Sequence, residues 1–186
     1  HIFGVICVIL LPSGMLFWFL IHLWAPRWRR LGPARTYLIV LPVVIALGVV
    51  LYRFRGRLLG EDLGTNWILI GIAGVFYAST MWFEFQYWEH LSIATLIGLT
   101  ELSRTGSETS KLLREGMYAR LRHPRYASAG LGLIGNILSI NYVGLYVLFL
   151  LVIPMGLWLL GLEERELVDR FGDSYRQYQR EVPQLI

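Results

Sequence analysis

Two polar clusters flank the last long apolar run of the chain, and their residue types are suited to holding a ligand. Arg122-His-Pro-Arg-Tyr126 precedes the run, and Glu163-Glu164 follows it. Proline fits the first turn of a helix, where backbone N–H groups favour an anion, and Arg122 and His123 add further donors. The acidic pair suits an ammonium group or a pair of hydroxyls. Together the clusters predict a site for a zwitterionic ligand.

The two clusters meet only if the chain turns back between them. Residues 126–162 carry no charge, and they are too many for one straight span of a hydrocarbon core ~30 Å thick but enough for two short spans. We expect a helical hairpin that turns near Ser139-Ile-Asn141. Such a hairpin brings His123 and Glu163 to the same side of a membrane.

Composition places this hairpin in a membrane protein. Apolar residues make up 55% of the chain and charged residues only 16%, whereas soluble domains carry about a quarter charged residues. Three earlier apolar runs, at residues 2–24, 36–52 and 66–83, each predict a span. We therefore predict an all-α, polytopic membrane protein with about five transmembrane helices. It forms a single domain over residues 1–186, with three spans in 1–90, a cytosolic connector in 91–125, the hairpin in 126–162 and a cytosolic tail in 163–186.

The distribution of basic residues predicts the orientation and argues against other classes. Fourteen Lys and Arg residues fall in the first loop, the connector and the tail, against three in the second loop, which favours a cytosolic site. The arginines adjoin apolar spans, so we expect contact with membrane lipids and no nucleic-acid binding. The chain has one cysteine, which excludes an internal disulfide, and no His, Cys, Asp and Glu set has the spacing of a metal site.

Gly130, Gly132 and Gly135 form the pattern GxGxxG of a dinucleotide-binding turn. That function requires a strand before the glycines and a helix after them, but here they lie within an uncharged span. Small residues in such a span let helices or a ligand approach closely. Asn136 in the same span is expected to take part in helix packing, and His22 near the end of the first span is expected to lie at the membrane interface.

The basic cluster has a simpler explanation as a set of membrane anchors, with Glu163-Glu164 ending a span. The local pattern argues for more, because anchoring requires neither His-Pro-x-Tyr nor the preceding Gly116-x-Tyr118. The residues from Ser110 to Tyr126, then Glu163-Glu164, Phe171-Gly-Asp-x-Tyr-x-x-Tyr178 and Val182-Pro183, resemble the isoprenylcysteine carboxyl methyltransferase family. That family belongs to a wider group of integral membrane methyltransferases that includes the phospholipid N-methyltransferases.

The resemblance implies S-adenosylmethionine as the methyl donor and a lipophilic or lipidated acceptor that enters from the bilayer. By motif position, the cofactor-binding residues are Leu112, Leu113, Tyr118, His123, Pro124, Tyr126 and Glu163. Glu164, His123 and Arg122 are assigned to the catalytic group. A carboxylate acceptor requires little acid or base, whereas an amine acceptor must lose a proton to Glu164 or to His123. Tyr175 and Tyr178 are expected to pack the tail onto the site.

Two departures from the family pattern leave the acceptor open. Leu159 and Leu160 occupy the region where carboxyl methyltransferases carry a substrate-binding arginine, and Ser110 replaces a histidine. Two alternatives also remain at this stage. One is a membrane reductase of the sterol or steroid type, which shares a similar Arg-His-x-x-Tyr and acidic-tail arrangement but binds NADPH. The other is a membrane scaffold without catalytic activity.

Overall fold

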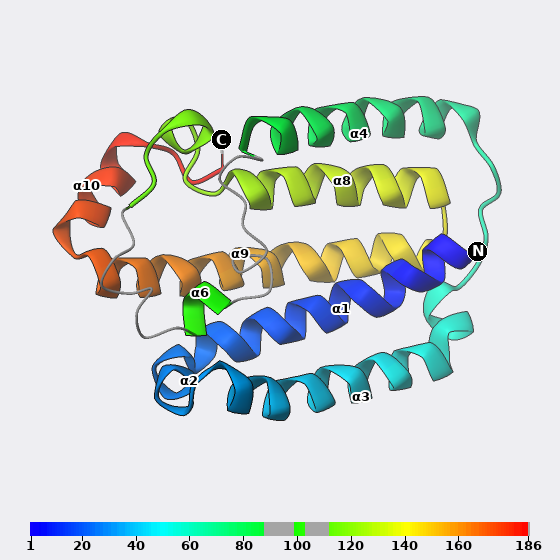
Figure 1. The fold of residues 1–186 in the computed structure, drawn as a ribbon. Helices are drawn as coiled ribbons and strands as arrows, with labels where there is room; N and C mark the ends of the chain where they lie inside the picture. Colours follow the sequence, from blue (N-terminus) through cyan, green and yellow to red (C-terminus); the bar gives the residue numbers. More distant parts are fainter. Residues whose placement is uncertain (88–98, 103–111, 186) are drawn as a thin grey trace.

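The computed structural model describes residues 1–87, 99–102 and 112–185, which leaves Ser110 and most of the first part of the expected connector outside the described residues. The all-α prediction is confirmed, because nearly every described segment is helical and no strand occurs among the described residues. Figure 1 shows the helices in chain order. They are α1 (Ile2–Leu23), α2 (Ala25–Leu31), α3 (Pro33–Leu59), α4 (Trp67–Tyr87), α6 (Leu99–Leu102), the 3-10 helix η2 (Gly116–Ala119), α8 (Pro124–Ile140), α9 (Val143–Phe171) and α10 (Asp173–Glu181).

The long helices are suited to a bilayer. α1, α3, α4 and α9 are each long and apolar enough to cross a membrane. The fifth predicted span is α8, whose 17 residues extend about 25 Å, slightly less than a typical hydrocarbon core. The polytopic membrane prediction is thus confirmed. α9 continues through Glu163 and Glu164 to Phe171, so the acidic pair lies within a continuous helix.

The long helices run side by side (Figure 1). The two helices of the predicted hairpin, α8 and α9, belong to different layers, one formed by α4 and α8 and the other by α9, α1 and α3. α4 packs along α8, while α1 packs between α3 and α9. The glycines of α8 explain the first contact. A Cβ atom on Gly135 would lie 3.0 Å from the Tyr77 ring, and one on Gly132 would lie 3.5 Å from Thr80, so both glycines serve close helix packing. Tyr77 also donates to Asn136 Oδ1 at 3.0 Å, as expected for a residue that joins two helices.

One end of the bundle, which we call the Asp62 end, contains the turn between α8 and α9. The turn falls at Asn141, as predicted, with φ 56° in the left-handed region. Asn141 Nδ2 donates to Gly64 O at 2.8 Å, and the Tyr142 hydroxyl donates to Asp62 Oδ2 at 2.8 Å. Gly144 allows α9 to start against the end of α3, because a Cβ atom there would lie 1.7 Å from Leu58 O.

The other end, which we call the α10 end, contains the chain reversal between α9 and α10. Gly172, with φ 57°, ends α9 and lets α10 fold back. On the α1 side of this end, an apolar cluster of Ile21, Trp28, Val40 and Leu102 joins α1, α2, α3 and α6. The polar clusters identified in the sequence lie at the α10 end.

Candidate active site

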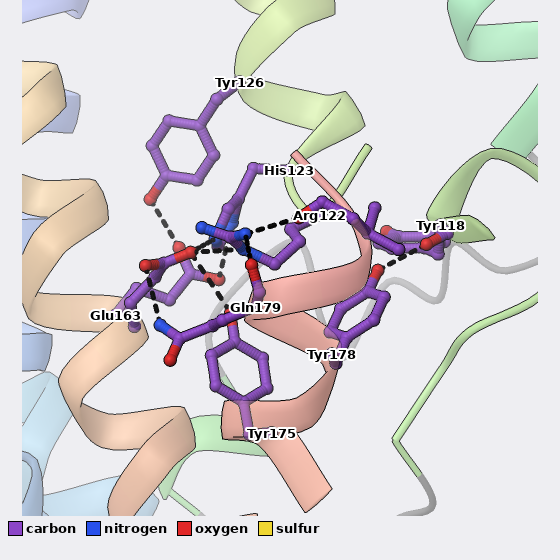
Figure 2. A network of polar contacts seen from close by, with 10 residues as sticks. Tyr118, Arg122, His123, Tyr126, Glu163, Tyr175, Tyr178 and Gln179 are labelled. Carbon is purple, nitrogen blue, oxygen red and sulfur yellow. Dashed lines mark hydrogen bonds and ion pairs between the residues drawn. The ribbon is translucent and has the colours of Figure 1, made fainter. Parts of the chain in front are cut away.

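The start of α8 and the last turns of α9 bring the two polar clusters together. His123 is the N-cap of α8 and Pro124 its first residue, where a fixed φ and a missing N–H suit a helix start. Figure 2 shows Arg122, His123 and Tyr126 facing the acidic helix that carries Glu163, with Tyr175 and Gln179 of α10 beside them. The predicted meeting of the basic and acidic clusters is therefore what the structure contains.

Glu164 is the centre of the contacts. Its carboxylate lies 2.7 Å from Arg122 Nε and 3.2 Å from His123 Nε2. Gln179 Nε2 donates to its second oxygen at 3.0 Å, and the Tyr175 hydroxyl donates at 3.4 Å. The side chains of Glu164 and Arg122 are only 13% and 9% exposed. Because a carboxylate with an arginine partner and several donors is stabilised in its charged form, Glu164 holds the site together as an anion.

Glu163 has fewer partners and is more open. The Tyr126 hydroxyl donates to Glu163 Oε2 at 2.7 Å, and Oε1 lies 4.0 Å from His123 Nδ1. The side chain of Glu163 is 29% exposed, about twice the value for Glu164. The buried His123 ring therefore lies between two carboxylates, of which one is saturated and one can still accept a bond from a ligand.

Arg122 also fixes the C-terminal segment over the site. Its Nη1 donates to the carbonyls of Gln179 and Val182. The backbone N–H of Arg122 donates to Pro183 O at 2.9 Å, and that of His123 donates to Gln184 O at 3.2 Å. The N–H of His123 at the helix start is thus already bound. Since Arg122 points inward and is nearly buried, it is not a surface anchor.

Two tyrosines of α10, Tyr175 and Tyr178, lie on the lower side of the network in Figure 2. The Tyr178 hydroxyl donates to Tyr118 O, and the Arg114 guanidinium lies 5.3 Å from the Tyr178 ring centroid. Burial raises the pKa of Tyr178 to about 12, although nearby Arg122 acts in the opposite direction. Burial, together with the negative charge of Glu164, also raises the pKa of Tyr175. Both hydroxyls therefore stay protonated at neutral pH and act as donors.

The structure assembles most of the residues proposed from the sequence. Arg122, His123, Tyr126, Glu163 and Glu164 form one contact network. Tyr118 reaches the network through Tyr178. Leu112 and Leu113 are half-buried in the irregular segment before η2. Leu159 and Leu160, in place of the expected arginine, are 2% and 1% exposed.

Sequence reasoning missed the roles of Tyr175 and Gln179 as partners of Glu164. The signal was available in part, because residues 175, 178 and 179 share one face of a short helix. A cavity of about 330 Å³ between α9 and α10 borders this contact and is lined by Gly161, Glu164, Arg165, Val168, Asp169 and Gln179. Within the described part of the chain, no group of three or more His, Cys, Asp and Glu residues could hold a metal ion.

These features define the class of protein. It is a bundle of membrane helices with a buried acid–base network at one end. The sequence profile of the phospholipid methyltransferase family matches residues 68–174, more than half of the chain. The protein belongs to this family of membrane methyltransferases, so the resemblance inferred from the motifs is confirmed.

One curated relative is similar over a shorter region. The protein-S-isoprenylcysteine O-methyltransferase of Schizosaccharomyces pombe is 34% identical over 76 residues, which make up 40% of this chain and 32% of the relative. The match thus spans about a third of that relative's length. No solved structure matches the chain at a comparable level.

Proposed function

We propose that the protein is an integral membrane methyltransferase that transfers a methyl group from S-adenosylmethionine to a lipophilic acceptor entering from the bilayer. The observation that carries this proposal is the network of Arg122 and His123 with Glu163 and Glu164 at one end of a membrane bundle, in a chain of a methyltransferase family. The relative's name adds support for a lipid-modified acceptor.

The acidic side of the site suits the ammonium group of such a donor. S-adenosylmethionine supplies a methyl group on a sulfonium centre and carries an ammonium and a carboxylate on its methionine part. Glu163 lies 4.0 Å from His123 Nδ1 and its side chain is 29% exposed, so this carboxylate is accessible and suits the ammonium. Tyr126 orients Glu163, and the half-buried Leu112 and Leu113 offer apolar contacts for the adenosine part.

The residues differ in what they contribute. Glu164 and Arg122 neutralise one another and hold α8, α9 and α10 in register, so Arg122 acts on the reaction by positioning. The buried His123 ring is the group that could take a proton from an amine acceptor, whereas a carboxylate acceptor would need no base. Methyl transfer then depends mainly on alignment in a site that excludes water.

The orientation belongs to the same proposal. The arginine-rich segments before α3, before α8 and in the tail favour the cytosolic side for the α10 end. The donor would then reach the site from the cytosol and the acceptor from the membrane.

Binding of the demethylated product tests the proposal. We expect S-adenosylhomocysteine to bind the purified protein and raise its melting temperature. Tyr126→Phe should weaken this binding roughly tenfold, because Glu163 loses its orienting donor. Tyr142→Phe is the matched control, since it removes the same kind of hydroxyl–carboxylate bond at the Asp62 end and should leave the affinity unchanged.

Transfer itself is measured by incubating the protein with labelled S-adenosylmethionine and a membrane lipid extract. A labelled lipophilic product that disappears in Glu163→Ala supports the proposal. Protection by NADPH without protection by S-adenosylhomocysteine would identify a reductase instead. Absence of both, together with unchanged cellular function in His123→Ala and Glu163→Ala, would identify a scaffold.

A further inference from the structure

A second buried ion cluster lies at the α10 end, outside the network described above. Glu166 of α9 lies 2.9 Å from His22 Nδ1 of α1, and its other oxygen accepts a bond from Arg29 of α2. The side chains of His22 and Glu166 are only 3% and 15% exposed. His22 is therefore not a simple interfacial residue, because its ring is enclosed and paired.

Glu166 points away from the candidate active site. It follows Glu164 by two positions, which is about 200° around an α-helix. Glu164 contacts Arg122, just before α8, and Gln179 of α10, whereas Glu166 contacts α1 and α2. The last turns of α9 are thus held by charged contacts on two opposite sides.

The partners of Glu166 sit on a well-packed support. The Trp28 indole donates to Leu20 O at 2.7 Å, which ties α2 to α1. The His22 ring stacks on Trp18 with centroids 5.6 Å apart. Ile21 and Leu102 are fully buried in the apolar cluster below. Because α1 and α2 are fixed in this way, they can set the rotation of α9.

We propose that Glu166 is a positioning residue, which locks the rotation of α9 against α1 and α2 so that Glu163 and Glu164 face α8. The inference rests on the proposed methyltransferase function of the site. Breaking a buried ion pair is costly, so the contacts of Glu166 with His22 and Arg29 disfavour a rotation of α9. Methyl transfer is sensitive to such geometry, since a misplacement of about 1 Å can cost a large factor in rate.

The first arm of the test measures catalysis in Glu166→Gln, which keeps the shape of the side chain and removes its charge. We expect kcat to fall roughly tenfold, while the Kd for S-adenosylhomocysteine changes less than about threefold, because Glu163 keeps the bond from Tyr126 that orients it. Asp173→Asn is the matched control, since it neutralises the exposed partner of Arg176 on α10 and should change neither value.

The second arm measures position without requiring activity. Spin labels at Ala129 of α8 and Asp169 of α9, both exposed, are introduced into a Cys7→Ser background. The distance distribution between them should broaden or shift in Glu166→Gln and stay unchanged in Asp173→Asn. If the wild type binds no S-adenosylhomocysteine and transfers no methyl group, the proposed function fails, but this arm still tests the position of α9.

An unchanged distance distribution with unchanged kcat in Glu166→Gln would overturn the proposal. If that variant does not fold, His22→Gln is used in its place, because it retains the Arg29 contact and removes one half of the cluster. Failure of both variants to fold would show that the cluster serves stability alone, which also overturns the proposal.

Discussion

The two ends of the bundle use the same type of bond for different purposes. At the α10 end, the Tyr126 hydroxyl donates to Glu163 at 2.7 Å, and at the Asp62 end, the Tyr142 hydroxyl donates to Asp62 at 2.8 Å. The first bond lies beside a buried ion pair between the segment before α8 and α9, to which Gln179 of α10 also donates. The second joins an exposed loop to a turn and adjoins backbone contacts between the same segments. The bond alone therefore does not mark a site; buried charge assembled from distant segments does.

The largest expected effect follows from this difference in burial. Glu164→Gln leaves the Arg122 guanidinium buried without its counter-charge, and we expect the free energy of unfolding to fall by about 3 kcal/mol. Chemical denaturation in detergent micelles, followed by the loss of helical circular dichroism, measures it. Asp62→Asn is the matched variant at the other end, where an exposed carboxylate loses its charge and should change stability little.

Equal losses in the two variants would contradict the comparison, because they would mean that burial does not distinguish the two carboxylates. A loss in Glu164→Gln that Arg122→Leu partly reverses in the double variant would sharpen it. That result would assign the cost to the unpaired guanidinium.

A smaller effect is expected at the Asp62 end, where the contact is steric. Gly144→Ala places a Cβ atom 1.7 Å from Leu58 O and 2.7 Å from Leu59 O, so α9 and α3 must separate. We expect a loss of about 2 kcal/mol in the free energy of unfolding. Gly156→Ala in the same helix meets nothing within 4 Å and should be neutral or slightly stabilising. Similar results for both alanine variants would show that the close approach at Gly144 is not required.

Much of the fold could be predicted from the sequence because local patterns determine it. Pro124 marks the start of α8, Asn141 the turn and Gly172 the end of α9. The length of each apolar run predicts where a membrane span lies. The meeting of His123 with Glu163 followed from the uncharged hairpin between them. These features depend on residues that are close in sequence or on simple chain reversal.

The remaining features depend on contacts between distant segments. The sequence places Arg122 and Glu164 in one site but does not indicate that the two side chains pair with each other, since arginines beside a span usually face lipid headgroups. The pairing of His22 with Glu166 likewise depends on how α1 packs against α9. Sequence periodicity gives the face of each helix but not which partner helix that face meets.

The smallest effect on stability at neutral pH is expected for Tyr175 and Tyr178, which pack α10 onto the site. Their contribution to stability should change only at high pH. Burial raises the pKa of Tyr178 in the folded protein to about 12, whereas an unfolded tyrosine titrates near about 10. Folding favours the protonated hydroxyl, so its contribution to stability is complete below about pH 10 and is lost as pH rises through about 12. Melting temperatures measured across this range, with tyrosinate absorbance as the titration signal, should show this fall.

Tyr178→Phe should reduce the fall, and the double variant with Tyr175→Phe should reduce it further, because burial also raises the pKa of Tyr175. An undiminished fall in the double variant would mean that alkali acts elsewhere, and the packing of α10 onto the site would then not limit stability at high pH.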